Sequence, residues 1–111
     1  EQVGEIASCF AFRDKFPVSK GHSLVIPKRV VPSYFDLSFR EQSACWFLVN
    51  LVKEELQKTH NPDGFNVGIN SGTAAGQTVP HCHIHIIPRY NGDMENPRGG
   101  VRGVIPEKQS Y

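Results

Sequence analysis

Apolar residues follow two different spacings along the chain, and each spacing predicts a different kind of element. Residues 6–12 and 22–26 are short and rich in apolar or β-branched side chains, with proline, serine and glycine in residues 16–21 between them. Residues 65–70 alternate between large apolar and polar or small side chains, as a half-buried strand does. We therefore expect strands at 6–12, 22–26 and 65–70.

In the middle of the chain the apolar residues are instead three and four positions apart, which is the spacing of one helix face. Ser38 and Glu41 precede this run with the spacing of a capping box, in which each side chain bonds the backbone amide of the other residue. One stripe of the helix would face the core: Cys45, Leu48, Val49, Val52 and Leu56. We expect one long helix that ends at the turn-forming residues 61–64.

Three further apolar residues of this helix lie off the stripe: Trp46, Phe47 and Leu51. They either cover the edges of the core under loops or contact a second copy of the chain. The pattern is compatible with both roles.

Residues 81–87 alternate once more, with a histidine at every second position from 81 to 85. On a strand, side chains two positions apart share a face, so three imidazoles would form a row on the exposed or cleft-facing side: His81, His83 and His85. The residues that alternate with them would face the core: Cys82, Ile84 and Ile86. Because neighbouring side chains on a strand point apart, Cys82 and His83 cannot form a Cys–His catalytic pair.

Three roles are open to the histidine row. The first is structural, with the histidines satisfied by hydrogen bonds, and the second is as ligands of a metal such as zinc. The third is catalytic, with one histidine attacking phosphorus as a neutral imidazole. The preceding loop, residues 72–79, offers small, hydroxyl and amide groups but no carboxylate or thiolate to complete a metal shell. It also lacks the lysine of a kinase or ATPase phosphate loop. The loop therefore suits an anion, which favours the catalytic interpretation.

Length and charge narrow the class of protein further. The 111 residues fit a single domain, 1–111, and a net charge of +1 from 12 basic and 11 acidic residues provides no field for nonspecific nucleic-acid or anionic-membrane binding. Three widely spaced cysteines argue against a disulfide framework and favour reduced thiols and a cytoplasmic location. No apolar run approaches the roughly 20 residues of a membrane span, and the N-terminus has no signal pattern.

The tail is loop-like at 91–100, with a short strand expected at 101–105.

Residues 76–87, Gly-Gln-Thr-Val-Pro-His-Cys-His-Ile-His-Ile-Ile, resemble the signature of the histidine triad family of nucleotide hydrolases and transferases. The resemblance extends to residues 14–28 and 65–72. The segments at 88–90 and 97–102 resemble microbial diadenosine polyphosphate hydrolases, near the fragile-histidine-triad branch. Val30 is a departure, because many relatives carry a histidine there. Since the chain also has no cysteine pair, we do not expect the structural zinc of some relatives.

The resemblance implies an α+β fold: an antiparallel sheet of about five strands with the long helix packed on it, usually in a two-fold dimer. It also implies roles for four histidines. His83 matches the nucleophile that attacks the α-phosphorus of a nucleotide and forms a covalent nucleotidyl-histidine, which water hydrolyses. His85 matches a phosphate-contacting partner, His81 a member of the supporting network, and His22 the residue that braces the triad.

The resemblance also assigns nucleotide-binding positions. Asp14 matches the residue that accepts hydrogen bonds from the ribose hydroxyls, although without the resemblance its place before Phe16 and Pro17 favours a turn residue. Asn70 and the loop after it match phosphate-binding groups, with Gln77 orienting the leaving oxygen. The loop residues concerned are Gly76, Gln77, Thr78 and Val79. Arg98 and Arg102 either meet distal phosphates or belong to a solvated loop.

These expectations describe a homodimeric hydrolase of phosphoric anhydride or phosphoramidate bonds. It would release a nucleoside monophosphate such as AMP from a dinucleoside polyphosphate or a nucleoside phosphoramidate. We expect no protein-bound metal or cofactor, although Mg²⁺ carried by a polyphosphate substrate is compatible with the chemistry. The expected partner is a small nucleotide, not a nucleic acid or a membrane. The alternatives are a nonenzymatic purine-nucleotide-binding module and a three-histidine metal protein.

Overall fold

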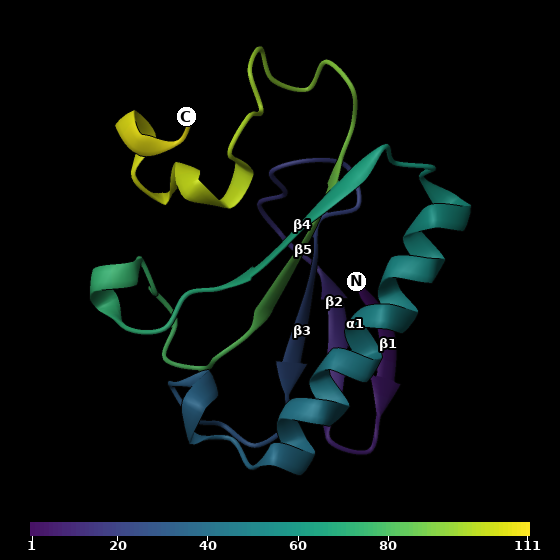
Figure 1. Cartoon of the computed structure of the whole chain (residues 1–111). Coiled ribbons are helices and arrows are strands. Elements are labelled where there is room, and N and C mark those ends of the chain that lie inside the picture. The colour runs from purple at the N-terminus through teal and green to yellow at the C-terminus, as the bar shows by residue number, and fades with distance from the viewer.

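Five strands form one antiparallel sheet in the order β1-β2-β3-β5-β4, and one long helix lies against it (Figure 1). The computed structural model describes all residues, 1–111. The strands are β1 (Gln2–Ile6), β2 (Cys9–Arg13), β3 (Ser23–Pro27), β4 (Gly64–Ile69) and β5 (Ile84–Arg89). This arrangement confirms the predicted α+β fold with a five-stranded antiparallel sheet.

The helix α1 (Phe39–Thr59) has the predicted start and the predicted buried stripe. The Glu41 amide donates to Ser38 Oγ at 3.1 Å, and the Ser38 amide donates to Glu41 Oε1 at 2.9 Å, which completes the capping box. All five stripe residues are buried: Cys45, Leu48, Val49, Val52 and Leu56. They pack against β1, β2, β3 and β5, so α1 covers one face of the sheet.

The second face of the sheet carries the candidate site. Alternation along the strands points one set of side chains away from α1, which we call the open face: Phe10, Phe12, Leu24, His85 and Ile87. Across the sheet, Phe12 is opposite Leu24, Leu24 opposite His85, and His85 opposite Gly68. The open face therefore runs from an apolar half on β2 and β3 to a histidine on β5.

Two predicted strands have different limits in the structure. The strand expected at 6–12 is divided by a two-residue turn at Ala7 and Ser8, which joins β1 and β2 in a hairpin. The strand expected at 81–87 begins only at Ile84, so His81 and His83 lie in the segment before it. The apolar half of that prediction is confirmed, because Cys82, Ile84 and Ile86 are all buried.

Four short 3₁₀ helices complete the fold: η1 (Tyr34–Asp36), η2 (Thr73–Ala75), η3 (Gly100–Val104) and η4 (Pro106–Lys108). The short strand predicted at 101–105 was wrong, because Gly99 and Gly100, with φ of 90° and 49°, turn the chain into η3. In Figure 1 this C-terminal segment, drawn in yellow, lies on the opposite side of β4 and β5 from α1. None of the helices combines the length and the apolar composition that crossing a membrane requires.

Candidate active site

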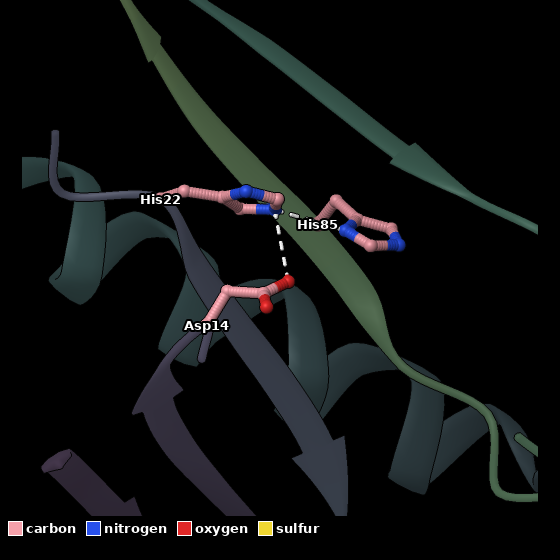
Figure 2. Close-up of side chains that lie close together, drawn as sticks. All are labelled: Asp14, His22 and His85. Atoms are coloured by element: carbon pink, nitrogen blue, oxygen red, sulfur yellow. Dashed lines mark hydrogen bonds and ion pairs between the residues drawn. The ribbon is translucent and has the colours of Figure 1, made fainter. Parts of the chain in front are cut away.

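Three segments that are distant in the sequence bring an aspartate and two histidines together. Asp14 follows the end of β2, His22 directly precedes β3, and His85 lies on β5. Figure 2 shows their side chains pointing toward one another. His22 Nε2 lies 3.0 Å from His85 Nδ1 and 3.5 Å from Asp14 Oδ2. The structure thus joins three of the predicted site residues, and the ring of His83 lies beside that of His85 with centroids 4.9 Å apart.

The position of the proton on His22 follows from its hydrogen bonds. This ring is buried, and the backbone amide of Val18 donates to its Nδ1 at 3.0 Å. An amide can only donate, so Nδ1 accepts, and a neutral His22 carries its proton on Nε2. The Nε2–H then donates to His85 Nδ1, the nearer of its two acceptors.

The same logic applies to His85. Its Nδ1 accepts the hydrogen bond from His22, so a neutral His85 carries its proton on Nε2. Burial lowers the pKa of both His22 and His85 from the ordinary histidine value, while the carboxylate of Asp14 acts in the opposite direction. Both rings are therefore neutral near pH 7, and His85 presents an N–H donor to an oxygen above the open face.

His83 has the opposite tautomer. Its Nδ1 lies 3.0 Å from the backbone carbonyl of His81. A carbonyl can only accept, so His83 Nδ1 carries a proton and donates it. The Nε2 of a neutral His83 is consequently an unprotonated nitrogen with a free lone pair. This nitrogen has the electronic state that a nucleophile needs.

The ring of His81 is held by a hydrogen bond to β3. It lies before β5, and its Nε2 donates to the carbonyl of Pro27 at 2.7 Å, at the far end of β3 from His22. The predicted alternation is present, because His81, His83 and His85 are half-buried while Cys82, Ile84 and Ile86 are buried, and the rings of His83 and His85 are in contact. His81 also supports His83 through its backbone carbonyl.

The loop before the histidines provides groups for an anion. The backbone amides of Thr78 and Val79 have no acceptor within the chain. Gln77 is used inside the loop, where its Oε1 accepts from the Gly72 amide at 2.8 Å and its Nε2 donates to the carbonyls of Pro32 and Val79 at 2.7 and 3.0 Å. In this arrangement Gln77 holds the shape of the loop, and the amides of Thr78 and Val79 are left without a partner in the chain.

Asp14 holds a turn with one carboxylate oxygen and faces the site with the other. Its Oδ1 accepts from the Phe16 amide at 2.8 Å, which is the turn role, while Oδ2 faces His22. The carboxylate is mostly covered, at 17% side-chain exposure, and it lies at the end of β2 beside the apolar half of the open face. It still has lone pairs for a ribose hydroxyl.

A family model described as "HIT domain" matches residues 1–92. The chain belongs to the HIT domain family. The bifunctional bis(5'-adenosyl)-triphosphatase/adenylylsulfatase FHIT of Arabidopsis thaliana is 44% identical over 79 residues, which cover 71% of this chain and 44% of that protein. The bis(5'-adenosyl)-triphosphatase of Dictyostelium discoideum is 44% identical over 87 residues, covering 78% of this chain and 58% of that protein. The chain thus spans less than two thirds of the length of these relatives.

Solved structures agree with the fold. A HIT family protein from Bacillus anthracis matches with a TM-score of 0.79 at 40% identity, covering 83% of this chain and 65% of that one. The match of the family model ends at residue 92, so the segment that contains η3 and η4 lies beyond it.

A metal does not suit the donor atoms that this HIT domain brings together. Ligand atoms of Asp14, His22 and His85 lie within 4.8 Å of one another. Of these residues, only His85 belongs to the alternating histidines at 81–85 that suggested a metal site from the sequence. A histidine that binds a metal normally donates a hydrogen bond from its other ring nitrogen. A metal on His22 Nε2 would place a proton on Nδ1, directly against the Val18 N–H. The hydrogen bond from Val18 therefore opposes metal binding through His22 Nε2.

The arginines of the tail are occupied by the tail itself. The guanidinium groups of Arg98 and Arg102 lie over the ring of Tyr111, 5.0 and 4.8 Å from its centroid. Arg102 also donates to the carbonyls of Lys108 and Gln109 at 2.9 and 3.3 Å. Of the two interpretations from the sequence, these contacts favour an exposed loop over contact with distal phosphates, and they add that both side chains hold the end of the tail.

Proposed function

We propose that this HIT domain hydrolyses a nucleotide at the α-phosphorus through a covalent nucleotidyl-His83 and releases a nucleoside monophosphate such as AMP. The free lone pair on His83 Nε2 carries this proposal, since the His81 carbonyl holds the proton on the other nitrogen. The printed names of the A. thaliana and D. discoideum relatives, both bis(5'-adenosyl)-triphosphatases, support this class of reaction.

In the first step, His83 Nε2 forms a bond to phosphorus, and the bond from phosphorus to the leaving group breaks. The ring becomes positively charged, and its Nδ1–H stays with the His81 carbonyl, which stabilises that charge. The His85 Nε2–H donates to an oxygen on which negative charge develops, together with the Thr78 and Val79 amides. A phosphate leaving group departs as an anion and needs no proton, whereas the nitrogen of a phosphoramidate takes up one proton from solvent as its bond to phosphorus breaks.

In the second step, water attacks the same phosphorus, and the phosphorus–nitrogen bond returns its electron pair to His83 Nε2. One proton of the water is released to solvent, and the nucleoside monophosphate leaves. Two displacements at a labile intermediate replace one difficult hydrolysis.

The open face supplies the remaining contacts. The ribose would bond Asp14 Oδ2, and the base would lie on the apolar half next to it, which Phe12 and Leu24 form as direct cross-strand neighbours. Asn70 at the end of β4 would contact the phosphoryl group. The magnesium carried by a polyphosphate and the cytoplasmic location stay predictions.

The test is to incubate the protein with diadenosine tetraphosphate and with an adenosine phosphoramidate, and to measure AMP. We expect AMP from the wild type, none from His83→Asn, and an adenylyl adduct on His83 in rapidly quenched wild-type samples. Nucleotide binding without AMP release by the wild type would overturn the proposal in favour of the nonenzymatic binding module.

We also propose that the chain forms a homodimer through the outer side of α1. Phe47 and Leu51 are 58% and 42% exposed, so loops do not cover them as one sequence interpretation required. Trp46 is also exposed, and its Nε1 donates to the Tyr34 hydroxyl at 3.0 Å. Light scattering should give twice the chain mass for the wild type and the single mass for Phe47→Glu. A monomeric wild type would contradict this arrangement.

A further inference from the structure

The loop between β2 and β3, residues 14–22, carries the amide that bonds the ring of His22. Within this loop the Val18 amide donates to His22 Nδ1 at 3.0 Å. The side chains of Phe16 and Val18 are 86% and 74% exposed, so apolar packing of these residues does not hold the loop. The position of the Val18 amide must therefore come from other contacts of the loop.

Two hydroxyl groups tie this loop to the end of β5. Ser19 Oγ donates to the backbone carbonyl of Pro88 at 2.6 Å, and Tyr90 Oη donates to the backbone carbonyl of Lys20 at 2.7 Å. Ser19 belongs to the loop, whereas Tyr90 directly follows β5. The loop and the end of β5 are thus joined by a hydrogen bond in each direction.

The limits of the sheet explain why side chains make this connection. The pairing of β3 with β5 reaches Ser23 opposite Ile86 and ends there. Pro88 lies two residues further along β5 and has no amide N–H, so its carbonyl is the only backbone group that it offers for a hydrogen bond. The Ser19 hydroxyl bonds this carbonyl and extends the contact with β5 beyond the last backbone pair.

A turn links Ser19 to His22. The His22 amide donates to the Ser19 carbonyl at 3.1 Å, and Val18, the residue before Ser19, bonds the His22 ring. The other side of the ring bonds His85 of β5 at 3.0 Å (Figure 2). Both nitrogens of His22 are therefore held from β5, Nε2 directly through His85 and Nδ1 through the anchored loop.

Hydrogen bonds at both nitrogens fix the plane of the His22 ring, and the Val18 amide also opposes a proton on Nδ1. Around this ring, Asp14 faces Nε2 from the end of β2, His85 bonds it from β5, and His83 precedes β5. Burial lowers the pKa of His22, while the Asp14 carboxylate acts in the opposite direction. If the loop moved away, water would reach Nδ1, the pKa of His22 would rise, and the ring could turn away from His85.

We propose that Ser19 and Tyr90 are positioning residues of the reaction, because their hydroxyl groups hold the Val18 amide on His22 and so keep His22 aligned with His85. The inference rests on the proposed function, in which His85 donates to an oxygen that gains negative charge. Both hydroxyls donate to carbonyls of the chain itself, so they act through the loop and not by touching the nucleotide.

The test uses the double variant Ser19→Ala/Tyr90→Phe and the two single variants. Ser19→Thr keeps a hydroxyl at the first position and serves as the conservative variant. Ser38→Ala is the matched control, because it also loses one hydrogen bond of a hydroxyl, at the start of α1 and outside the loop. The measured quantities are the pKa of His22 from NMR titration, and kcat and KM for AMP release from diadenosine tetraphosphate.

In the double variant the pKa of His22 should rise toward the ordinary histidine value, because Nδ1 loses the amide that opposes its protonation. We expect kcat to fall at least about tenfold and KM to stay within about twofold, since the His85 donor acts where charge develops in the transition state. Each single variant should show part of both changes. Ser19→Thr and Ser38→Ala should show neither.

A double variant with the wild-type pKa of His22 and the wild-type kcat would overturn the proposal, because the hydroxyls would then contribute to stability alone. The same holds if Ser38→Ala changed both quantities equally. The single variants, which each lose one hydrogen bond, decide the proposal by the same two measurements if the double variant does not fold.

Failure of the proposed function is recognised separately, as no AMP from the wild type. The NMR titration then decides whether the hydroxyls hold His22. A raised pKa of His22 in the double variant and not in Ser38→Ala supports this role of Ser19 and Tyr90. An unchanged pKa overturns it.

Discussion

At the scale of single residues, the site is defined by which ring nitrogens carry protons. Val18 sets the tautomer of His22, His22 sets that of His85, and the His81 carbonyl sets that of His83. The sequence predicts the histidines from their spacing and the family signature. It does not predict these three assignments, because two of them depend on backbone groups, which every residue has.

The tautomers can be measured directly. In the ligand-free protein at pH 7.5, His83 should be protonated on Nδ1, whereas His22 and His85 should be protonated on Nε2. Long-range ¹H–¹⁵N NMR of the imidazoles distinguishes the two forms. The ring of His60, which lies outside the site at the end of α1, provides a reference in the same spectrum. A proton on His83 Nε2 would contradict the assignment of the nucleophile.

The lowered histidine pKa values also predict how stability depends on pH. Because burial lowers the pKa of His22 and His85 in the folded state, the unfolded chain takes up protons first as the pH falls below about 6.5. The contribution of these two rings to the free energy of unfolding should therefore be constant above that pH and decrease below it, until the folded-state pKa values are reached. Urea denaturation at pH 7.5 and 5.5 measures the decrease. The decrease in the free energy of unfolding between these pH values should be smaller in His22→Asn than in the wild type. An equal decrease in both proteins would show that the His22 ring does not cause it.

At the scale of elements, the sequence predicts best what local contacts determine. The helix α1 was predicted at both ends because its capping box and its stripe are properties of neighbouring residues. The β1–β2 hairpin was missed, because its turn residues, Ala7 and Ser8, lack the asparagine–glycine pattern of such turns. A short strand was predicted in the tail at 101–105, but the conformation there depends on contacts with Gln109 and Tyr111.

The capping box gives a prediction confined to one element. Ser38→Ala removes the acceptor of the Glu41 amide and should lower the free energy of unfolding by about 1 kcal/mol. The matched control is Ser43→Ala on the exposed side of the same helix, where alanine should raise the stability by a few tenths of a kcal/mol. Chemical denaturation separates the two, and AMP release should be the same in both. Equal effects on stability would show that the cap does not contribute.

At the scale of the whole molecule, the core and the site meet at Gly21. This residue has φ of 89°, and a Cβ there would lie 2.8 Å from Leu56 Cδ2 of α1 and 3.3 Å from Pro88 Cγ of β5. The next residue is His22, whose ring is set by Val18 and His85. The close contact between Gly21 and Leu56 of α1 therefore fixes the position of His22 in the site.

Gly21→Ala should consequently damage stability and activity together. The left-handed backbone alone costs about 1–2 kcal/mol of folding free energy for alanine. The overlap of the new Cβ with Leu56 adds to this cost and displaces the loop that carries His22. Gly92→Ala is the matched control, because Gly92 has nearly the same φ, 87°, and open space around its Cβ position. We expect both variants to unfold at lower urea concentration, Gly21→Ala the more so, and only Gly21→Ala to lose AMP release at temperatures where both remain folded. If Gly92→Ala lost activity equally, backbone strain and not the contact with Leu56 would link the core to the site.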